Sequence, residues 1–252
     1  ALAGRVGWWI SPTYRMADDV WRELKTALDG AIVDKSETMR RLEVVGGGVI
    51  GCEFANDLLL GGLQFLLIIP EARDGLAALE KTLDTQLLTA ARQRCPNIPF
   101  HQGDMRTFNL GRQFDVITCL FSSIGYVKTL DRLQQALNCM GRHLNPGGIL
   151  ILEPWFTPDA WYSNTVHAVF IDEPDLKIAR VNTSFQEGML SIFDLHYLIG
   201  TPQGTRYAVE HHEMGLFTRQ QYLDALVNAG LEPICDEQGL TGRGAYLGFM
   251  DG

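Results

Sequence analysis

The stretch RRLEVVGGGVIGCEF, residues 40–54, carries an apolar strand directly into a glycine loop. Its glycines have the spacing G-x-G-x-x-G, in which the missing side chains let the backbone approach a dinucleotide. An acidic residue follows the last glycine by roughly 20 residues, where a ribose ligand is expected. A tight turn or hairpin loop is the alternative. The stretch predicts cofactor contacts from Gly46, Gly47, Gly48 and Glu71.

Outward from this loop, short apolar strands alternate with segments of helical periodicity. LQFLLII is apolar throughout, as a parallel strand buried on both faces should be. This alternation predicts a doubly wound, mostly parallel α/β sheet. The expected strands after the loop are LQFLLII, FDVITCLF and GILILEP, and the expected helices include LEKTLDTQLLTAARQR and LDRLQQALNCMGRHL.

The rhythm changes after residue 175. Three runs with period-2 character, joined by turn residues, predict an antiparallel β meander. We expect this meander, residues 176–213, to be a lid inserted in one α/β cofactor-binding domain formed by residues 1–175 and 214–252. A helix over TRQQYLDALVNAG follows, with Thr218 as its N-cap.

Composition excludes several classes of function. The chain has 252 residues, a net charge of -9 and a sequence pI near 5.1, which disfavours binding to nucleic acid because that needs clustered Lys and Arg. Its five cysteines are odd in number and form no C-x-x-C pair, so they indicate reduced core thiols. No apolar run reaches the roughly 20 residues that span a bilayer. We expect a cytoplasmic protein without a membrane partner.

In an open α/β sheet, ligands bind beyond the carboxyl ends of the parallel strands. Three of the loops that leave those ends carry an acid near the strand end: Glu71, Asp104 and Glu153.

Residues 87–250 resemble the class I S-adenosylmethionine-dependent methyltransferases, above all those that dimethylate the amine of dTDP-linked amino sugars. The resemblance is carried by the ordered strings IPFHQGDMRTF, FDVITCLFSSIGY, RHLNPGGILILEPW, VEHHEMGLFTRQQY and GLTGRGAYLGF. It implies S-adenosyl-L-methionine as cofactor and a small amine-bearing acceptor, such as a dTDP-sugar, as substrate. Counted from Glu43, however, two of the three positions at which this class has alternate glycines hold Val45 and Val49.

The resemblance also implies cofactor contacts in the later loops. Asp104 would accept a hydrogen bond from the adenine amino group, and Met105 would pack against the base. Phe121 and Ser122 would lie beside the methionine part of the cofactor. The alternatives are a solvated turn Asp, a core Met and a Ser-rich helix cap.

The candidate catalytic residues are Tyr126, Glu210 and His212. These methyltransferases commonly carry a His after SSIG, proposed to handle the amine proton, whereas this chain has Tyr126. On a strand, Glu210 and His212 share one face and His211 and Glu213 the other, so one pair should look inward. A polar face of the lid sheet is the alternative. Adjacent strand residues diverge and no third ligand is suitably spaced, so we expect no metal.

The candidate substrate-binding residues are Glu153, Trp155 and Arg243. Arg243 lies between glycines, which suits a diphosphate, although a surface turn with a solvated Arg has the same pattern. Trp155 would wall the substrate, or simply pack the lid. A homodimer is a further expectation.

The front of the chain, residues 5–73, instead resembles a fragment of the ATPase domain of phage terminase large subunits. It lacks G-x-x-x-x-G-K-[ST], and Pro70-Glu71 stands where two Walker B acids would lie. Two other functions therefore stay open: a cofactor-binding protein without catalysis, and a terminase-like nucleotide-hydrolysing fragment.

Overall fold

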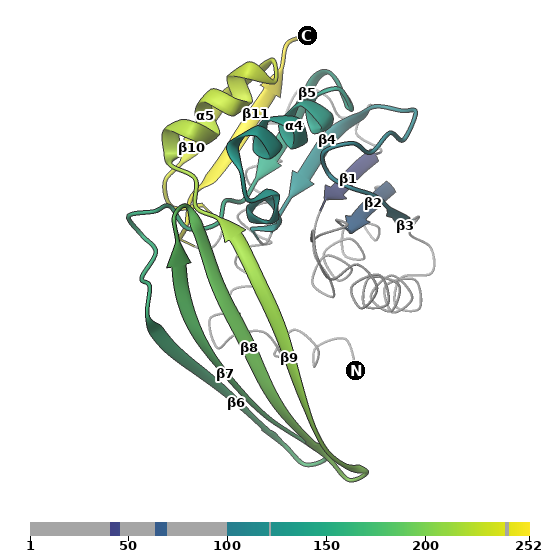
Figure 1. Cartoon of the computed structure of the whole chain (residues 1–252). Coiled ribbons are helices and arrows are strands. Elements are labelled where there is room, and N and C mark those ends of the chain that lie inside the picture. The colour runs from purple at the N-terminus through teal and green to yellow at the C-terminus, as the bar shows by residue number, and fades with distance from the viewer. Residues whose placement is uncertain (1–40, 46–63, 70–99, 121, 240–241) are drawn as a thin grey trace.

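The computed structural model describes residues 41–45, 64–69, 100–120, 122–239 and 242–252 (Figure 1). Within these ranges the chain forms two sheets and two α-helices. The larger sheet and both helices make an α/β body, and the smaller sheet projects from it as four long strands (Figure 1).

The larger sheet has seven strands in the order β10-β11-β5-β4-β1-β2-β3. Strands β3, β2, β1, β4 and β5 run parallel, and β11 and β10 are antiparallel additions beside β5. The predicted doubly wound, mostly parallel sheet is confirmed, and the last two strands of the chain, β10 and β11, join it after the lid. The bounds are β1 Arg41–Val45, β2 Gln64–Ile69, β3 Phe100–Gln102, β4 Phe114–Cys119, β5 Leu144–Leu152, β10 Leu231–Asp236 and β11 Ala245–Met250.

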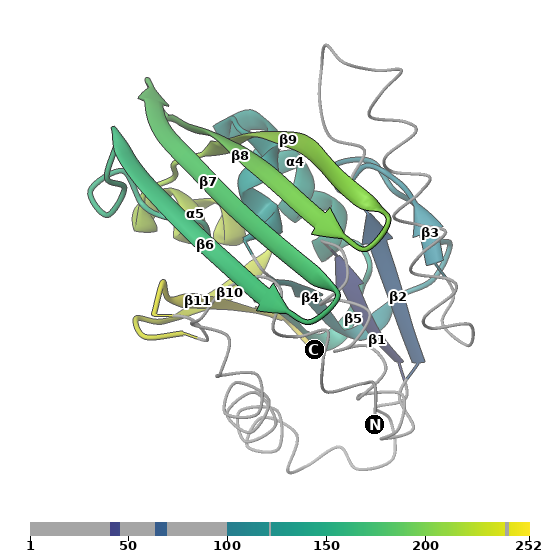
Figure 2. The same cartoon turned by 90° about the horizontal axis from the view of Figure 1, so that it is seen from below.

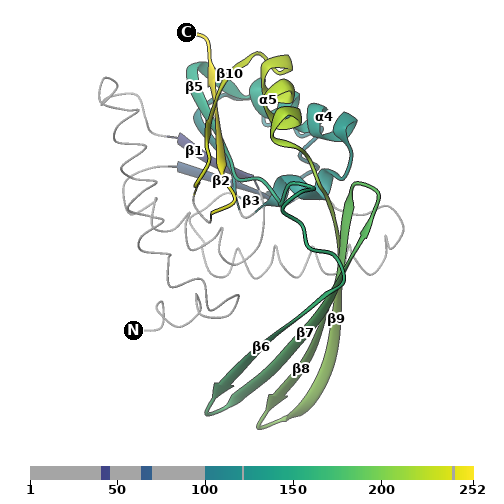
Figure 3. The same cartoon turned by 90° about the vertical axis from the view of Figure 1, so that its left-hand side faces the viewer.

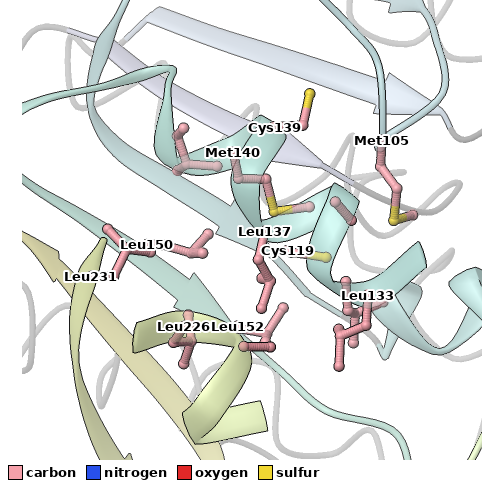
Figure 4. Packing of buried hydrophobic residues seen from close by; sticks show 14 of the residues in the cluster. Met105, Cys119, Leu133, Leu137, Cys139, Met140, Leu150, Leu152, Leu226 and Leu231 are labelled. Atoms are coloured by element: carbon pink, nitrogen blue, oxygen red, sulfur yellow. The ribbon is translucent and has the colours of Figure 1, made fainter. Parts of the chain in front are cut away.

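Helices α4, Leu130–Gly141, and α5, Arg219–Asn228, lie on the same side of this sheet (Figure 3). Each helix begins at a threonine whose hydroxyl accepts a backbone N–H, and the cap of α5 is the predicted Thr218. The apolar stripe of α4 packs on β5, so that Leu133, Leu137 and Leu150 are fully buried (Figure 4). This core fixes the ends of β4 and β5, where the candidate site begins.

The smaller sheet consists of β6 Thr165–Glu173, β7 Leu176–Glu187, β8 Leu190–Thr201 and β9 Gly204–Gly215. All neighbours are antiparallel, and the strands lie side by side in sequence order (Figure 2). We call it the lid sheet. The predicted meander started at residue 176, whereas the sheet starts one strand earlier, at Thr165. That the lid is an insertion in one α/β cofactor-binding domain stays a prediction.

Strand pairing assigns each lid residue to one of two faces, since directly paired residues point the same way. Pairs such as Ser184 with Phe193 and Phe193 with His212 define the face that contacts the α/β body, which we call the inner face. Pairs such as Ala168 with Val181 and Leu198 with Tyr207 define the outer face.

Two further expectations concern absences. Among the helices that the structure describes, none is long and apolar enough to cross a membrane. In the same part of the chain, no three His, Cys, Asp or Glu side chains gather as metal ligands would. The helix predicted over residues 79–94 lies outside the described residues.

Candidate active site

The turn after β4 opens the site. Ser122 adopts a left-handed backbone conformation, with φ of 58°, and its hydroxyl donates to the Pro154 carbonyl at 2.7 Å. Ser123 donates to the Leu120 carbonyl at 2.8 Å. Both hydroxyls thus bind this turn to its own strand and to the end of β5. The predicted contact of Ser122 with cofactor remains a prediction, and Phe121 lies outside the described residues.

This turn leads into the 3-10 helix η4, Ser123–Val127, which presents Tyr126 to the lid sheet. The Tyr126 hydroxyl lies 2.8 Å from Nδ1 of His212 on β9. Gly125 permits this approach, because a Cβ there would lie 2.8 Å from Met214 Cε and 3.1 Å from Trp155 Cβ. The structure therefore brings together two of the three predicted catalytic residues, 86 positions apart in the chain.

Aromatic rings cover His212 from the other side. Phe193 stacks on its imidazole with centroids 5.0 Å apart, and Trp155 stacks on Phe193 at 5.7 Å. The Trp155 Nε1 donates a hydrogen bond to Ser191 Oγ at 2.8 Å, which fixes the ring. The ring of Trp161 packs against that of Trp155, with centroids 5.8 Å apart. His212 Nε2 and Trp161 Nε1 are buried and make no hydrogen bond. Buried polar atoms are usually paired, so these two mark a place for ligand groups.

The strand alternation settles which pair of β9 residues looks inward. His212 and Glu210 belong to the inner face, and Glu210 Oε2 lies 3.6 Å from His212 Nε2. On the outer face, Glu213 accepts from Lys128 at 2.6 Å, and His211 Nδ1 lies 2.6 Å from an Asp194 oxygen. The hydrogen bond with Asp194 raises the pKa of His211 despite partial burial.

Two predicted substrate residues form a buried ion pair. Arg243 donates through Nη2 to Glu153 Oε1 at 3.0 Å, and the Glu153 side chain is 1% exposed. The guanidinium also lies over the rings of Trp155 and Phe156, at 5.6 and 5.5 Å. Its Nε is buried without a hydrogen-bond partner. Arg243, Glu153 and Trp155 therefore share one wall beside the aromatic rings.

At the end of β3, Asp104 is half-buried and accepts hydrogen bonds from the backbone and side chain of Arg106. Burial opposes ionisation, but these hydrogen bonds and the Arg106 charge together hold the pKa of Asp104 below its ordinary value. An ionised carboxylate at a strand end suits an amino donor of a nucleoside base. Met105 is 2% exposed and packs in the main core. A contact between Met105 and adenine stays a prediction.

Sequence reasoning overlooked several inner-face side chains. Ser191 and Phe193 on β8 hold and cover the site, and Tyr197 and Arg180 extend its polar surface along the lid. Their signal was the period-2 alternation in MLSIFDLHYLI, which puts Ser191, Phe193 and Tyr197 on one face. The remaining predicted cofactor residues, Gly46, Gly47, Gly48 and Glu71, lie outside the described residues.

Comparisons with known proteins show which family the chain resembles. A family model described as "Methyltransferase domain" matches residues 81–148. The chain is 37% identical over 167 residues to dTDP-3-amino-3,4,6-trideoxy-alpha-D-glucopyranose N,N-dimethyltransferase of Streptomyces venezuelae, covering 66% of this chain and 70% of that protein. It is also 37% identical over 168 residues to dTDP-3-amino-3,6-dideoxy-alpha-D-glucopyranose N,N-dimethyltransferase of Streptomyces fradiae, covering 66% of each. The matched region thus spans about two thirds of each curated relative.

Solved structures extend the similarity over nearly the whole chain. DesVI of Streptomyces venezuelae superposes with a TM-score of 0.78 at 28% identity, covering 94% of this chain and 93% of DesVI. The amino pentose methyltransferase CalS10 from Micromonospora echinaspora, solved with S-adenosylmethionine bound, gives 0.76 at 28% identity and covers 98% of this chain and 94% of CalS10. None of these proteins is a terminase, so the resemblance of residues 5–73 to terminases is not supported.

Proposed function

The chain belongs to the family of S-adenosylmethionine-dependent methyltransferases that includes the dTDP-amino-sugar N,N-dimethyltransferases, and we propose that it methylates the amine of a dTDP-linked amino sugar. When bound, S-adenosylmethionine supplies a methyl group on a positively charged sulfur, which an amine lone pair attacks in line. The chain must bind both molecules, align them and keep the amine neutral.

The described part of the cofactor site fits this molecule in its chemistry. Asp104 offers an ionised acceptor at the end of β3, and the left-handed turn at Ser122 brings backbone close to the sheet edge. Replacing Asp104 with Ala should weaken the calorimetric affinity for cofactor by about 1–3 kcal/mol, since a charge-assisted hydrogen bond is lost. The matched change at exposed Asp131 should leave affinity unaltered. An equal loss in both variants, or none at Asp104, contradicts this role.

His212 is the proposed base. If its Nδ1–H donates to the Tyr126 oxygen, the lone pair is on Nε2, which is buried beside the aromatic rings, makes no hydrogen bond and lies 3.6 Å from Glu210 Oε2. A base there takes the amine proton, while Tyr126 holds the imidazole in place. The missing hydrogen bond at the buried Nε2 is the observation on which the assignment of the base depends.

The acceptor would lie along the wall formed by Trp155 and the pair Glu153–Arg243. Glu153 offsets the charge of Arg243. The Nε of Arg243 is buried without a hydrogen-bond partner, so it can donate a hydrogen bond to a ligand. We assign this group to a phosphate oxygen of the sugar nucleotide, since guanidinium suits phosphate geometry. The Trp155 ring would pack against the sugar.

The decisive experiment replaces His212 with Gln. With a dTDP-amino sugar as acceptor, kcat should fall by about 100- to 10,000-fold, as for loss of a general base, while the calorimetric affinity for S-adenosylmethionine is unchanged. His211→Gln is the matched control, because His211 is on the outer face of the same strand. Equal losses in both variants contradict the base.

Two alternative functions give different results. If the wild-type chain binds the cofactor but methylates no amine, it is a cofactor-binding protein without catalysis. If it binds ATP in place of S-adenosylmethionine, it is a nucleotide-hydrolysing protein.

We also propose that the chain forms a homodimer through the outer face of the lid sheet. Seven exposed apolar side chains from all four strands lie on that face, among them Phe170 at 73% exposed. Together they expose on the order of 700 Å², taking roughly 150–200 Å² for each full side chain. That exceeds the patch of about 300–600 Å² usual on a monomer and approaches the roughly 800 Å² per partner of a stable interface. The seven are Val166, Phe170, Val181, Phe185, Leu198, Tyr207 and Val209.

Light scattering should give twice the chain mass of 28.1 kDa for the wild type and the single mass for Phe170→Asp. Leu130→Asp is the control, because Leu130 is also exposed, at 49%, but lies on α4. A monomeric wild type, or a dimer that survives Phe170→Asp, contradicts this interface.

Finally, we propose a cytoplasmic location. Cys119 and Cys139 are free thiols in the core, and burial raises their pKa to about 12 and about 11, so they stay protonated and unreactive. Such thiols persist in a reducing compartment. Recovery of the enzyme outside the cytoplasm on cell fractionation would contradict this.

A further inference from the structure

The inner face of the lid sheet carries a line of polar groups that starts at His212 and ends in solvent. Glu210 Oε2 is 3.6 Å from His212 Nε2, and the same oxygen accepts the Tyr197 hydroxyl at 3.1 Å. Tyr197 also hydrogen-bonds the side chain of Arg180, its direct partner across β7 and β8. The side chain of His212 is 14% exposed and that of Glu210 is 55% exposed. The line therefore leads from the covered site to water.

The need for such a route follows from the proposed function, on which this inference rests. Each methyl transfer forms a bond between nitrogen and carbon, breaks the bond between carbon and sulfur, and leaves the positive charge on nitrogen. The ammonium must lose a proton before that nitrogen can accept a second methyl group. Phe193 stacks on His212 and leaves its side chain 14% exposed, so water does not reach the imidazole freely.

We propose that Glu210 takes the proton from His212 and passes it to water, and that Tyr197 and Arg180 position Glu210 for this. The ammonium N–H bond breaks, its electron pair returns to nitrogen, and the proton binds Nε2. The Nε2–H bond then breaks and the proton binds Glu210 Oε2. The resulting carboxylic acid loses it to water, which restores both residues without any change of oxidation state.

The charged and titratable groups around this line support the direction of transfer. On the inner face, His212 meets Tyr126 from η4 and Glu210 from its own strand. The carboxylate favours the imidazolium that forms, because opposite charges at this separation attract. Lys128, Glu213 and His211 pair with one another or with Asp194 on the outer side, so they do not compete.

Tyr197 is suited to a positioning role. Burial, reinforced by the Glu210 charge, raises the pKa of Tyr197 to about 12, although Arg180 acts in the opposite direction. The hydroxyl therefore keeps its proton at neutral pH and donates to Glu210 in every turnover. Arg180 on β7 and Tyr197 on β8 meet across neighbouring strands, so Glu210 is positioned by two strands of the lid other than its own β9.

The test is Glu210→Gln. At low buffer concentration kcat should fall by about 10- to 100-fold while KM and cofactor affinity are unchanged, because the base remains but its proton leaves slowly. Added imidazole buffer should restore much of the rate, and the solvent deuterium isotope effect on kcat should increase. Tyr197→Phe should show the same buffer response with a smaller loss. Glu173→Gln is the control, because it removes an equal charge from exposed β6.

A readout without turnover accompanies these kinetics. In cofactor-free protein, the ¹⁵N resonance of His212 Nε2 should change in Glu210→Gln and stay unchanged in Glu173→Gln, because only Glu210 lies beside this atom. A change in Glu210→Gln alone supports the contact, and the same resonance in both variants overturns the proposal.

The kinetic outcomes separate this inference from the proposed function. Glu210→Gln at the wild-type rate, or slowed without a response to buffer, overturns the proton route while wild-type turnover keeps the function. A wild type that methylates no amine overturns both.

Discussion

The α/β body and the lid sheet use their side chains in opposite ways. In the body, sheet and helices bury each other, and residues such as Leu133 and Leu137 have no exposed surface. In the lid sheet, the inner face lines the candidate site and the outer face leaves Phe170 and Leu198 more than half exposed. We therefore expect the body to carry most of the folding stability, and the lid to serve the proposed recognition and self-association. Substitutions should therefore affect unfolding in one region and function in the other.

The largest difference is expected for the same change made in both regions. Leu137→Ala should lower the free energy of unfolding by about 3–5 kcal/mol, because it leaves a cavity in a packed core. Leu198→Ala, made in the monomeric Phe170→Asp chain, should cost less than about 0.5 kcal/mol, because that side chain is half exposed. Urea unfolding measures both. Equal losses would contradict the contrast.

The next effect tests the boundary between the regions, where the pair Glu153–Arg243 lies. Glu153→Gln should cost about 3 kcal/mol, because it leaves the Arg243 charge partly buried without its partner. Adding Arg243→Met to that variant should recover part of the loss. A double variant less stable than the single one would show that the pair does not act as a unit. Thermal and urea unfolding give the values.

A smaller effect belongs to the body alone. Thr218 and Gln221 form a capping box at the start of α5. Thr218→Ala should lower the free energy of unfolding by about 1 kcal/mol, whereas Thr218→Ser, which keeps the hydroxyl, should be nearly neutral. A serine variant as unstable as the alanine variant would point to packing rather than capping.

The smallest effect belongs to the lid and depends on pH. The hydrogen bond with Asp194 raises the pKa of His211, so this pair stabilises the fold below the unfolded pKa of His and loses that contribution as pH rises through the folded one. Asp194→Asn should therefore cost roughly 0.5 kcal/mol near pH 5.5 and less near pH 8.5, because both side chains are well exposed. The thermal unfolding midpoints of wild type and Asp194→Asn at the two pH values measure this difference. A larger loss of stability at the higher pH would contradict the stabilising role of the His211–Asp194 pair.

Much of the fold could be predicted because its signals are local. LQFLLII and FDVITCLF are mostly apolar runs of strand length, and α5 begins at a recognisable cap. Strand β6 escaped prediction because it is an edge strand of mixed residues, TVHAVFIDE, that becomes ordered by pairing with β7. Its place in the sheet depends on a partner rather than on its own pattern.

The site was predicted as a set of residues but not as a set of contacts. Tyr126 and His212 each stood out, yet only the folding of the lid over η4 brings them within 2.8 Å. The glycine loop and Glu71 were equally prominent and stay predictions, since they lie outside the described residues. Tyr197 gave only the period-2 alternation of its strand and Arg180 gave no signal of its own, because their proposed role comes from cross-strand pairing.

The two faces of the lid sheet have one evolutionary consequence. Because neighbouring side chains alternate, deleting a single codon within β9 would exchange the faces beyond that point, turning Glu210 outward and Val209 toward the site. Changes of two codons would preserve the alternation. Lengths of these strands among related genes should therefore differ by even numbers, and catalysis and self-association should be gained or lost together.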